Sequence, residues 1–458
     1  MDDERYIEEA LALAELGRGS THPNPMVGAV LVADGEVVGR GSHRGPGEPH
    51  AEVLALGDAG ERARGATLYC NLEPCSHFGR TPPCADALIA AGVARVVVAM
   101  RDPDPRVDGR GLERLRRAGV DVVLLDDPWA ARARKQNAAF VKFHATGLPL
   151  ITYKAAITLD GKVAGARGDA RWISCLESRR VVHRMRATCD AVMVGAGTLR
   201  RDDPELNVRL AEGRDPVRVI VTRSGILPPA SKVLATAHSI PTVVIAERCE
   251  EGTRRLLSAR GAELIEVGDG GLREGLAQLT RLGLLDVLCE GGPGLAGSLL
   301  ADGLIDRVML FVAPLVVGRG APDLFAAPAV EAVSEAWHLN DVEWRQICDD
   351  FVLTGTQDEN GTEIMTSFVK QFYSDAAYVP PEILLQNEVD EVSIIQSWLK
   401  TRRGEKVSVQ VPQRGKKREL VLMAAENATE TLNHLRLQWE MESNRYVTAL
   451  AELQEHLS

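Results

Sequence analysis

The chain has 458 residues, of which 45% are hydrophobic and 26% are charged, a length that predicts about three domains with packed cores. Its net charge of -11 argues against a surface that binds nucleic acid in general. Residues 1–5 (MDDER) are acidic and do not resemble a secretory signal, and no apolar run approaches the roughly 18 residues of a membrane span. We therefore expect a cytoplasmic protein without a membrane partner.

The first segment, residues 1–147, alternates between helical and strand patterns. Residues 6–16 have helical spacing before Gly17, and two apolar runs at 27–32 and 37–41 flank the turn dipeptide Asp34-Gly35, which predicts a hairpin. The later elements that we predict are a helix over 51–56, a strand over 66–70, a helix over 86–91 and a strand over 94–100. This alternation indicates a layered α/β domain.

The same segment contains a candidate zinc site. His50 is followed by Glu52, and Cys75 and Cys84 come later, each after a proline. One imidazole and two thiolates can occupy three corners of a tetrahedral zinc site and leave the fourth for water, whose pKa the metal lowers. Together with a glutamate that moves protons, this layout is typical of zinc-dependent deaminases. We predict one Zn²⁺ per chain, held by His50, Cys75 and Cys84, with Glu52 as the catalytic residue.

The spacing of the two cysteines leaves other interpretations open. Eight residues separate Cys75 from Cys84, where zinc deaminases usually have two. The three residues could instead be unrelated core residues, or the cysteines could form a disulfide in an oxidising compartment. The prolines and the helix predicted after Cys84 favour metal ligands at a helix start, where the helix dipole stabilises a thiolate.

Three features together resemble the RibD family of bifunctional riboflavin-biosynthesis deaminase/reductases. They are the run Thr21-His22-Pro23-Asn24-Pro25, the His50-Ala51-Glu52 motif and the long spacing between Cys75 and Cys84. The resemblance extends over residues 1–357. It implies a cytidine-deaminase-like α/β/α domain over 1–147, a dihydrofolate-reductase-like α/β domain over 148–357, and a homo-oligomer.

The resemblance also implies two reactions on a small phosphorylated pyrimidine. The first is the zinc-dependent hydrolytic deamination of 2,5-diamino-6-ribosylamino-4(3H)-pyrimidinone 5′-phosphate. The second is the NADPH-dependent reduction of the ribosyl group of 5-amino-6-ribosylaminouracil 5′-phosphate to a ribityl chain. In the deaminase it places Asn24 and His43 near the pyrimidine, and His77 and Arg80 suit the phosphate. Alternatively, Arg80 is a solvated loop charge and His43 is structural.

The second segment, residues 148–357, has two glycine-rich turns that follow predicted strands. The strand over 191–194 enters Gly195-Ala196-Gly197-Thr198, but Arg200 occupies the position of the last Rossmann glycine, which excludes that fingerprint. The second turn contains Gly291 and Gly292 and precedes a predicted helix over 295–300. The backbone N–H groups at such a helix start suit a cofactor pyrophosphate.

The resemblance implies a set of reductase residues in this segment. Those expected around the substrate are Lys154, Arg186, Arg209 and Glu290. Those expected around NADPH are Trp172, Thr198, Asp202 and Leu206. The glycine turn adds Gly291 and Gly292, and the run Thr222-Arg223-Ser224, just after a predicted strand over 217–221, suits the 2′-phosphate with Ser224 as a candidate contact. Ala170 departs from the family, which often has a serine there that contacts substrate. Some of these charges could instead form surface ion pairs, and the proton donor is left open, with Asp202 as a candidate.

The third segment, residues 358–458, changes in composition and predicts a mixed tail that ends in a helix. The run Val379-Pro380-Pro381 and the basic stretch 413–418 resemble the part of the excinuclease ABC C protein that precedes its RNase H-like nuclease. We expect neither nuclease domain of that protein and hence no DNA cleavage. The basic stretch could contact phosphates or be a solvated turn. An apolar stripe over 419–457 predicts a long helix that packs on its own domain or on a partner helix.

Two rival functions belong to other classes. The chain could be a DNA-repair protein that uses the front half as a scaffold, but its acidic charge speaks against this interpretation. It could also deaminate a nucleobase or nucleoside without any reductase activity. The glycine-rich second segment and the long ligand spacing favour the bifunctional enzyme.

Overall fold

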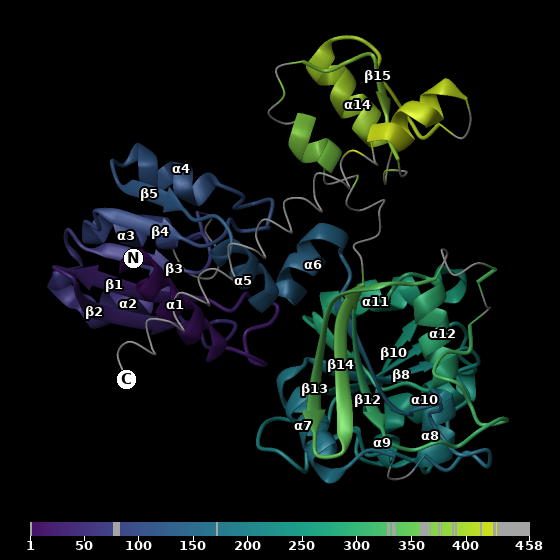
Figure 1. Cartoon of the computed structure of the whole chain (residues 1–458). Coiled ribbons are helices and arrows are strands. Elements are labelled where there is room, and N and C mark those ends of the chain that lie inside the picture. Colours follow the sequence, from purple (N-terminus) through teal and green to yellow (C-terminus); the bar gives the residue numbers. More distant parts are fainter. Residues whose placement is uncertain are drawn as a thin grey trace, which may run out of the picture. The chain divides into compact units, whose positions relative to one another are not determined.

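The computed structural model describes most of the chain and divides it into two compact units, residues 1–357 and residues 358–458 (Figure 1). The described residues are 2–76, 83–170, 173–327, 330–331, 336–357, 365, 368–373, 376, 378–386, 389, 392–412, 415–424 and 427. Within these ranges, no helix has the length and apolar character to cross a membrane.

The first part of the larger unit is a five-stranded sheet in the order β2-β1-β3-β4-β5. The strands are β1 (Gly28–Ala33), β2 (Glu36–Ser42), β3 (Thr67–Cys70), β4 (Arg95–Val98) and β5 (Asp121–Leu124). β1 pairs antiparallel with β2 across the predicted turn, and β3, β4 and β5 are parallel. The parallel strands place their carboxyl ends along one edge of the sheet.

Helices cover both faces of this sheet, which confirms the predicted α/β/α domain. On one face α1 (Asp2–Glu15) packs on β1 and β3, and on the other α2 (Ala51–Ala59) packs on β1 and β2. The layer of α2 continues with α3 (Cys84–Ala91) and α4 (Arg110–Arg117). The remaining helices of this part are a 3₁₀ turn (Gly60–Ala63), α5 (Trp129–Gln136) and α6 (Ala138–Thr146).

The second part of the larger unit is a nine-stranded sheet in the order β10-β9-β8-β7-β11-β6-β12-β14-β13. Its strands are β6 (Leu150–Thr158), β7 (Ala191–Gly195), β8 (Val217–Thr222), β9 (Thr242–Ala246), β10 (Glu263–Glu266), β11 (Asp286–Cys289), β12 (Arg307–Ala313), β13 (Leu339–Ile347) and β14 (Asp350–Gln357). The strands from β10 to β12 are parallel, and the β13–β14 hairpin extends the sheet antiparallel.

Helices flank this sheet and bury both of its faces. They are α7 (Leu176–Thr188), α8 (Ala196–Asp202), α9 (Lys232–Ala235), α10 (Glu251–Ala259), a 3₁₀ turn (Gly268–Gly270), α11 (Gly271–Arg281) and α12 (Pro293–Ala301). Alternate residues of β7 enter different cores: Val192 and Val194 lie in one, Ala191 and Met193 in the other. This near-continuous apolar strand is typical of a parallel sheet covered on both faces, and the predicted dihydrofolate-reductase-like domain is confirmed.

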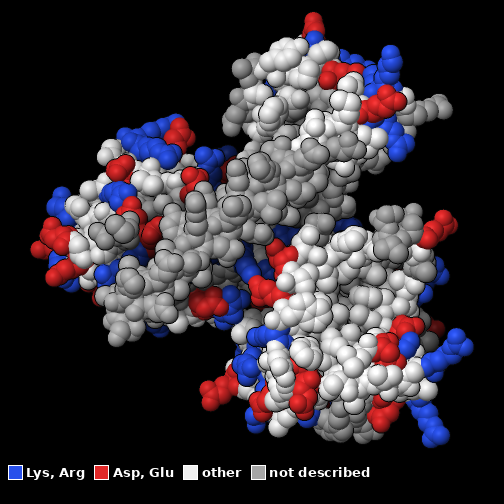
Figure 2. All heavy atoms as spheres, in the orientation of Figure 1, with Lys and Arg blue, Asp and Glu red and all other residues white. Residues whose placement is uncertain are grey.

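The smaller unit has a core of its own. The parallel strands β15 (Glu382–Leu384) and β16 (Ser408–Gln410) pack with α14 (Val392–Arg403), whose Ile395 and Leu399 are buried. In the basic stretch, Lys417 lies 2.5 Å from Glu382. Residues 416–424 are helical, and most of the predicted helix over 419–457 lies outside the described residues. Figure 2 shows acidic and basic side chains interspersed on the visible face of the described residues.

The close approach of α2 to β2 generates the first prediction. A Cβ atom on Gly41 would lie 1.9 Å from the backbone oxygen of Ala51, the first residue of α2. Gly41→Ala must therefore displace the helix start that carries His50. We expect a loss of about 1–3 kcal/mol in the free energy of unfolding, as for other overpacked sites, together with a lower zinc content. Denaturant unfolding and metal analysis of the purified protein measure both.

Gly57→Ala is the matched control, because Gly57 is on α2 and has no atom within 4 Å of the added Cβ. Replacing an exposed helical glycine by alanine should leave stability unchanged or raise it by up to about 1 kcal/mol. Equal behaviour of the two variants would show that the close contact at Gly41 does not position α2.

Candidate active sites

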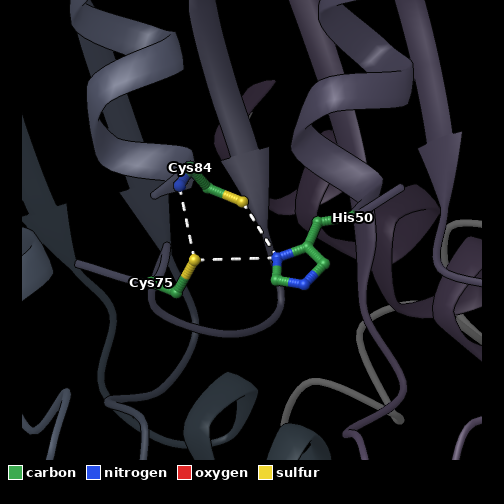
Figure 3. Close-up of side chains that lie close together, drawn as sticks. All are labelled: His50, Cys75 and Cys84. Carbon is green, nitrogen blue, oxygen red and sulfur yellow. Dashed lines mark hydrogen bonds between the residues drawn. The ribbon is translucent and has the colours of Figure 1, made fainter. Parts of the chain in front are cut away.

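The three predicted zinc ligands converge from separate elements of the first domain (Figure 3). His50 is the N-cap of α2, Cys84 is the first residue of α3, and Cys75 lies in the loop after β3. The His50 Nδ1 atom is 3.1 Å from the Cys84 Sγ and 3.6 Å from the Cys75 Sγ, and all three ligand atoms lie within 4.8 Å of one another. Two helix starts and the loop after β3 thus form a single site.

The donor set fits a zinc ion. Bonds of about 2.3 Å to sulfur and about 2.0 Å to nitrogen place tetrahedral ligands roughly 3.5 Å apart, close to the observed separations. All eight cysteines are free thiols, so a disulfide between Cys75 and Cys84 is not formed. Hydrogen bonds from the Cys84 side chain and the His50 ring hold the pKa of Cys75 well below its usual value. This favours the thiolate, which is the form that binds metal.

Glu52 lies directly behind these ligands, in the first turn of α2. Its side chain is buried, with a residue exposure of 3%. Burial, reinforced by the negative charge of Cys75, raises the pKa of Glu52 to about 7. A carboxyl group with a pKa near neutrality can both accept and return a proton, as a general acid–base catalyst must.

His50, Cys75 and Glu52 line a cavity of about 450 Å³. Asn24 and His43, which the family resemblance places near the pyrimidine, both line it. The Asn24 Nδ2 donates to the His43 Nε2 over 3.0 Å, and the His43 Nδ1 donates to the Pro49 carbonyl over 3.1 Å. Burial lowers the pKa of His43, which keeps the ring neutral in this arrangement. The predicted phosphate residues His77 and Arg80 lie outside the described residues.

Two acidic residues at this site were not predicted from the sequence. Glu73, two positions before Cys75, is buried and accepts backbone N–H groups of Gly109 at 2.9 Å and Gly111 at 2.8 Å. It thereby fixes the start of α4 beside the ligand loop. Asp102 lines the cavity, and burial raises its pKa to about 7. Its position just after β4, at the carboxyl end of a parallel strand, is the sequence signal that could have identified it.

In the second domain, three of the predicted substrate residues form a buried ion cluster. The Arg186 Nε and Nη2 atoms lie 2.6 and 3.1 Å from the two Glu290 carboxylate oxygens, and the Lys154 Nζ is 3.7 Å from Glu290. Burial opposes ionisation of Glu290, but the two cations prevail and lower its pKa to about 2. Burial lowers the pKa of Lys154. The cluster therefore carries one carboxylate beside two cationic side chains.

His183 extends this cluster and was also missed. It lies one turn before Arg186 on α7, is buried, and accepts the backbone N–H of Arg209 at its Nδ1 over 3.1 Å. Burial and the charges of Arg186 and Arg209 lower the pKa of His183 to about 4, so that the ring is neutral. The Arg209 guanidinium itself donates to Asn207 over 3.0 Å. The spacing of His183 and Arg186 on one helix was the available signal.

The predicted cofactor residues separate into two groups. The turns after β7 and β11 are neighbours, since these strands pair in parallel, and a Cβ on Gly292 would lie 3.6 Å from the Thr198 hydroxyl. Gly292 is the N-cap of α12, and a Cβ on Gly291 would meet Leu295 at 2.7 Å. This glycine-lined helix start fits a nucleotide pyrophosphate.

The other cofactor candidates lie at different places. Leu206 is 2% exposed and packs in the core, Ser224 is exposed after β8, and Asp202 is the last residue of α8. Trp172 lies outside the described residues. The side chain of Leu206 therefore faces its own domain, whereas Ser224 is open to a ligand.

Fold and sites define a zinc-dependent deaminase domain joined to a nucleotide-dependent reductase domain. Residues 1–100 match the cytidine and deoxycytidylate deaminase zinc-binding region, and residues 149–353 match the RibD C-terminal domain. The chain is 41% identical to riboflavin biosynthesis protein RibD of Escherichia coli over 77% of this chain and 99% of that protein. It is 44% identical to RibD of Aquifex aeolicus over 69% of this chain and 88% of that protein.

Solved structures agree with these relatives. The structure of Acinetobacter baumannii RibD superposes with a TM-score of 0.70 at 37% identity, covering 78% of this chain and 99% of that one. A deaminase/reductase from Thermotoga maritima gives a TM-score of 0.68 at 33% identity, covering 78% and 99%. The chain thus has a part that these structures lack. Residues 347–435 match the UvrC ribonuclease H-like domain, whereas the resemblance in the sequence placed the tail just before that domain.

The chain belongs to the RibD family. It is a bifunctional deaminase and reductase of riboflavin biosynthesis, with Zn²⁺ and NADPH as cofactors. The match over 149–353 speaks against the alternative of a deaminase without a reductase.

The buried ion cluster generates the second prediction. Because the folded-state pKa of Glu290 is depressed from 4.5 to about 2, its ionised form stabilises the fold above pH 4.5. This contribution, on the order of 3 kcal/mol, is lost as the pH falls from 4.5 towards 2. We expect Glu290→Gln to be less stable than wild type at pH 7, and the difference to shrink at pH 3. Denaturant unfolding at both pH values measures it.

Glu247→Gln is the control, because Glu247 forms an exposed ion pair with Arg223 at 3.7 Å. Such pairs contribute no more than about 1 kcal/mol to stability. The free energy of unfolding of this variant should therefore be close to that of wild type at both pH values. A Glu290→Gln difference that stays constant between pH 7 and pH 3 would contradict the depressed pKa.

Proposed function

We propose that residues 1–147 deaminate 2,5-diamino-6-ribosylamino-4(3H)-pyrimidinone 5′-phosphate, and that residues 148–357 reduce 5-amino-6-ribosylaminouracil 5′-phosphate. The observation that carries the proposal is the cluster of His50, Cys75 and Cys84, of which His50 and Cys75 line the same cavity as buried Glu52. The relative from Thermotoga maritima is described as a diaminohydroxyphosphoribosylaminopyrimidine deaminase and 5-amino-6-(5-phosphoribosylamino)uracil reductase, which supports these substrates.

In the proposed deaminase, His50, Cys75 and Cys84 hold the zinc ion. When bound, zinc lowers the pKa of water at its open position and so supplies a nucleophile at neutral pH. Glu52 accepts a proton at its carboxylate and returns it to the departing amino group, a role that suits a buried carboxyl group lining the same cavity as His50 and Cys75. Asn24 and the neutral ring of His43 orient the pyrimidine at the cavity wall.

In the proposed reductase, Lys154 and Arg186 bind the phosphorylated substrate, with Arg209 as a further cation. Glu290 holds Lys154 and Arg186 in place through its carboxylate. NADPH supplies the hydride when bound. Thr198, Gly291 and Gly292 lie at the helix start that suits its pyrophosphate, and exposed Ser224 suits its 2′-phosphate.

We also propose a cytoplasmic location and a homo-oligomeric assembly. Zinc-binding thiolates must stay reduced, which the cytoplasm ensures. Light scattering coupled to size exclusion measures the assembly, and a monomeric mass at micromolar concentration would contradict it.

A pair of glutamine variants separates the two activities. We expect Glu52→Gln to abolish ammonia release while zinc stays bound and pre-deaminated substrate is still reduced, because only the proton carrier is lost. Glu290→Gln should lower the reductase activity at least about 100-fold and leave ammonia release normal. Ammonia detection, NADPH absorbance and metal analysis on the same preparations measure these effects. Normal deamination by Glu52→Gln would refute the role of that residue.

A further inference from the structure

The run Thr21-His22-Pro23-Asn24-Pro25 contributes both to the deaminase cavity and to a contact with the second domain. Pro23, Asn24 and Pro25 line the deaminase cavity. His22 does not line it but is bound to the second domain, where its Nδ1 lies 2.7 Å from the Asp190 Oδ2. Both side chains are nearly buried, with exposures of 10% and 7%. A buried contact of this length is a strong, directional hydrogen bond.

Asp190 is itself held rigidly by the reductase sheet. It immediately precedes β7, and its Oδ2 accepts the backbone N–H groups of Leu285 and Asp286, each over 2.8 Å. The carboxylate is therefore fixed by the entry points of β7 and β11, two central strands of the sheet. His22 is held by a group that cannot move without disturbing these strands.

Two further contacts tie the same segment to the second domain. The Arg214 Nε donates to the Gly19 carbonyl over 2.6 Å, while its Nη2 donates to the Cys189 carbonyl over 3.0 Å. Pro23 lies against the turn at Gly283, where an added Cβ would be 3.3 Å from the proline Cδ. Residues 19–23 are thus held at three points by residues of the reductase domain.

On its other side, this segment sets the position of Asn24. The Asn24 backbone N–H donates to the Thr21 carbonyl over 2.8 Å, which closes a tight turn around His22. The Asn24 side chain then meets His43 at the cavity wall. Only one residue separates His22 from Asn24, so a displacement of the histidine moves the asparagine.

We propose that His22 is a positioning residue for the deaminase, through which Asp190 of the reductase domain holds Asn24 against the pyrimidine. This inference rests on the proposed role of the cavity. It makes substrate affinity at the deaminase dependent on the reductase domain, although zinc binding and Glu52 are provided by the first domain alone.

The test is steady-state deamination by the full chain carrying His22→Ala. We expect the KM for the diaminopyrimidinone to rise about tenfold, as for loss of one well-made buried hydrogen bond, with a smaller change in kcat. Zinc content and reduction of pre-deaminated substrate should match wild type. His22→Asn, whose amide can still donate to Asp190, should recover most of the lost affinity.

His238→Ala is the matched control, because His238 is an exposed histidine of the second domain whose Nε2 lies 3.3 Å from the Ala259 carbonyl of the same domain. It should leave the KM unchanged. A wild-type KM in His22→Ala overturns the inference, and so does a failure of His22→Asn to recover affinity. If His22→Ala does not fold, Arg214→Gln removes the contact with Gly19 and must raise the KM by itself. Absence of deamination in wild type would instead reject the proposed function.

Discussion

Parallel strand pairing is the constraint on which both sites depend. Parallel strands present all their carboxyl ends at one edge of a sheet, where loops and helix starts can converge. In the first domain this edge carries the loop with Cys75 after β3 and Asp102 after β4. In the second it carries the glycine turn after β7 and Glu290 after β11. The two chemistries thus use the same geometric solution on different sheets.

Both sites also have to stabilise charge away from water, and they do so differently. The reductase cluster pairs Glu290 with Arg186 and Lys154, since a buried charge without a partner would cost several kcal/mol. The deaminase site places two of its three ligands, His50 and Cys84, at the starts of α2 and α3, where backbone N–H groups and helix dipoles favour anions. Glu73 is stabilised by backbone N–H groups alone, which makes it a structural support for the ligand loop.

Residues 358–458 contain none of the residues that we propose for the two activities. Residues 358–458 form a unit with its own apolar core, and the solved RibD structures cover 78% of the chain. In that unit, Lys417 of the basic stretch pairs with Glu382, which shows one of these charges acting within the fold. The residues proposed for both activities lie within residues 1–357.

Local sequence determined the features whose causes are local. The histidine–glutamate motif, the prolines before the cysteines and the glycine turns predicted the zinc ligands and the helix starts, because capping and turn chemistry act over a few residues. Strand ends were less well predicted: the strand expected over 94–100 is β4 over Arg95–Val98, because its pairing with β3 and β5 extends over that length. Pairing with a distant strand leaves no mark in the neighbouring residues.

Only the tertiary structure decided which distant residues meet. Arg186 and Glu290 are 104 positions apart, and His22 and Asp190 are 168 apart. The family resemblance placed both residues of the first pair around the substrate, but no pattern in the sequence indicated that the residues of the second pair are in contact. Likewise, the burial that raises the pKa of Glu52 and lowers that of His183 arises from packing of several elements at once. The sequence by itself therefore determined which chemical groups each site contains. The tertiary structure decided which residues these groups contact and which protonation state they favour, because burial and contact arise only when helices and sheets pack together.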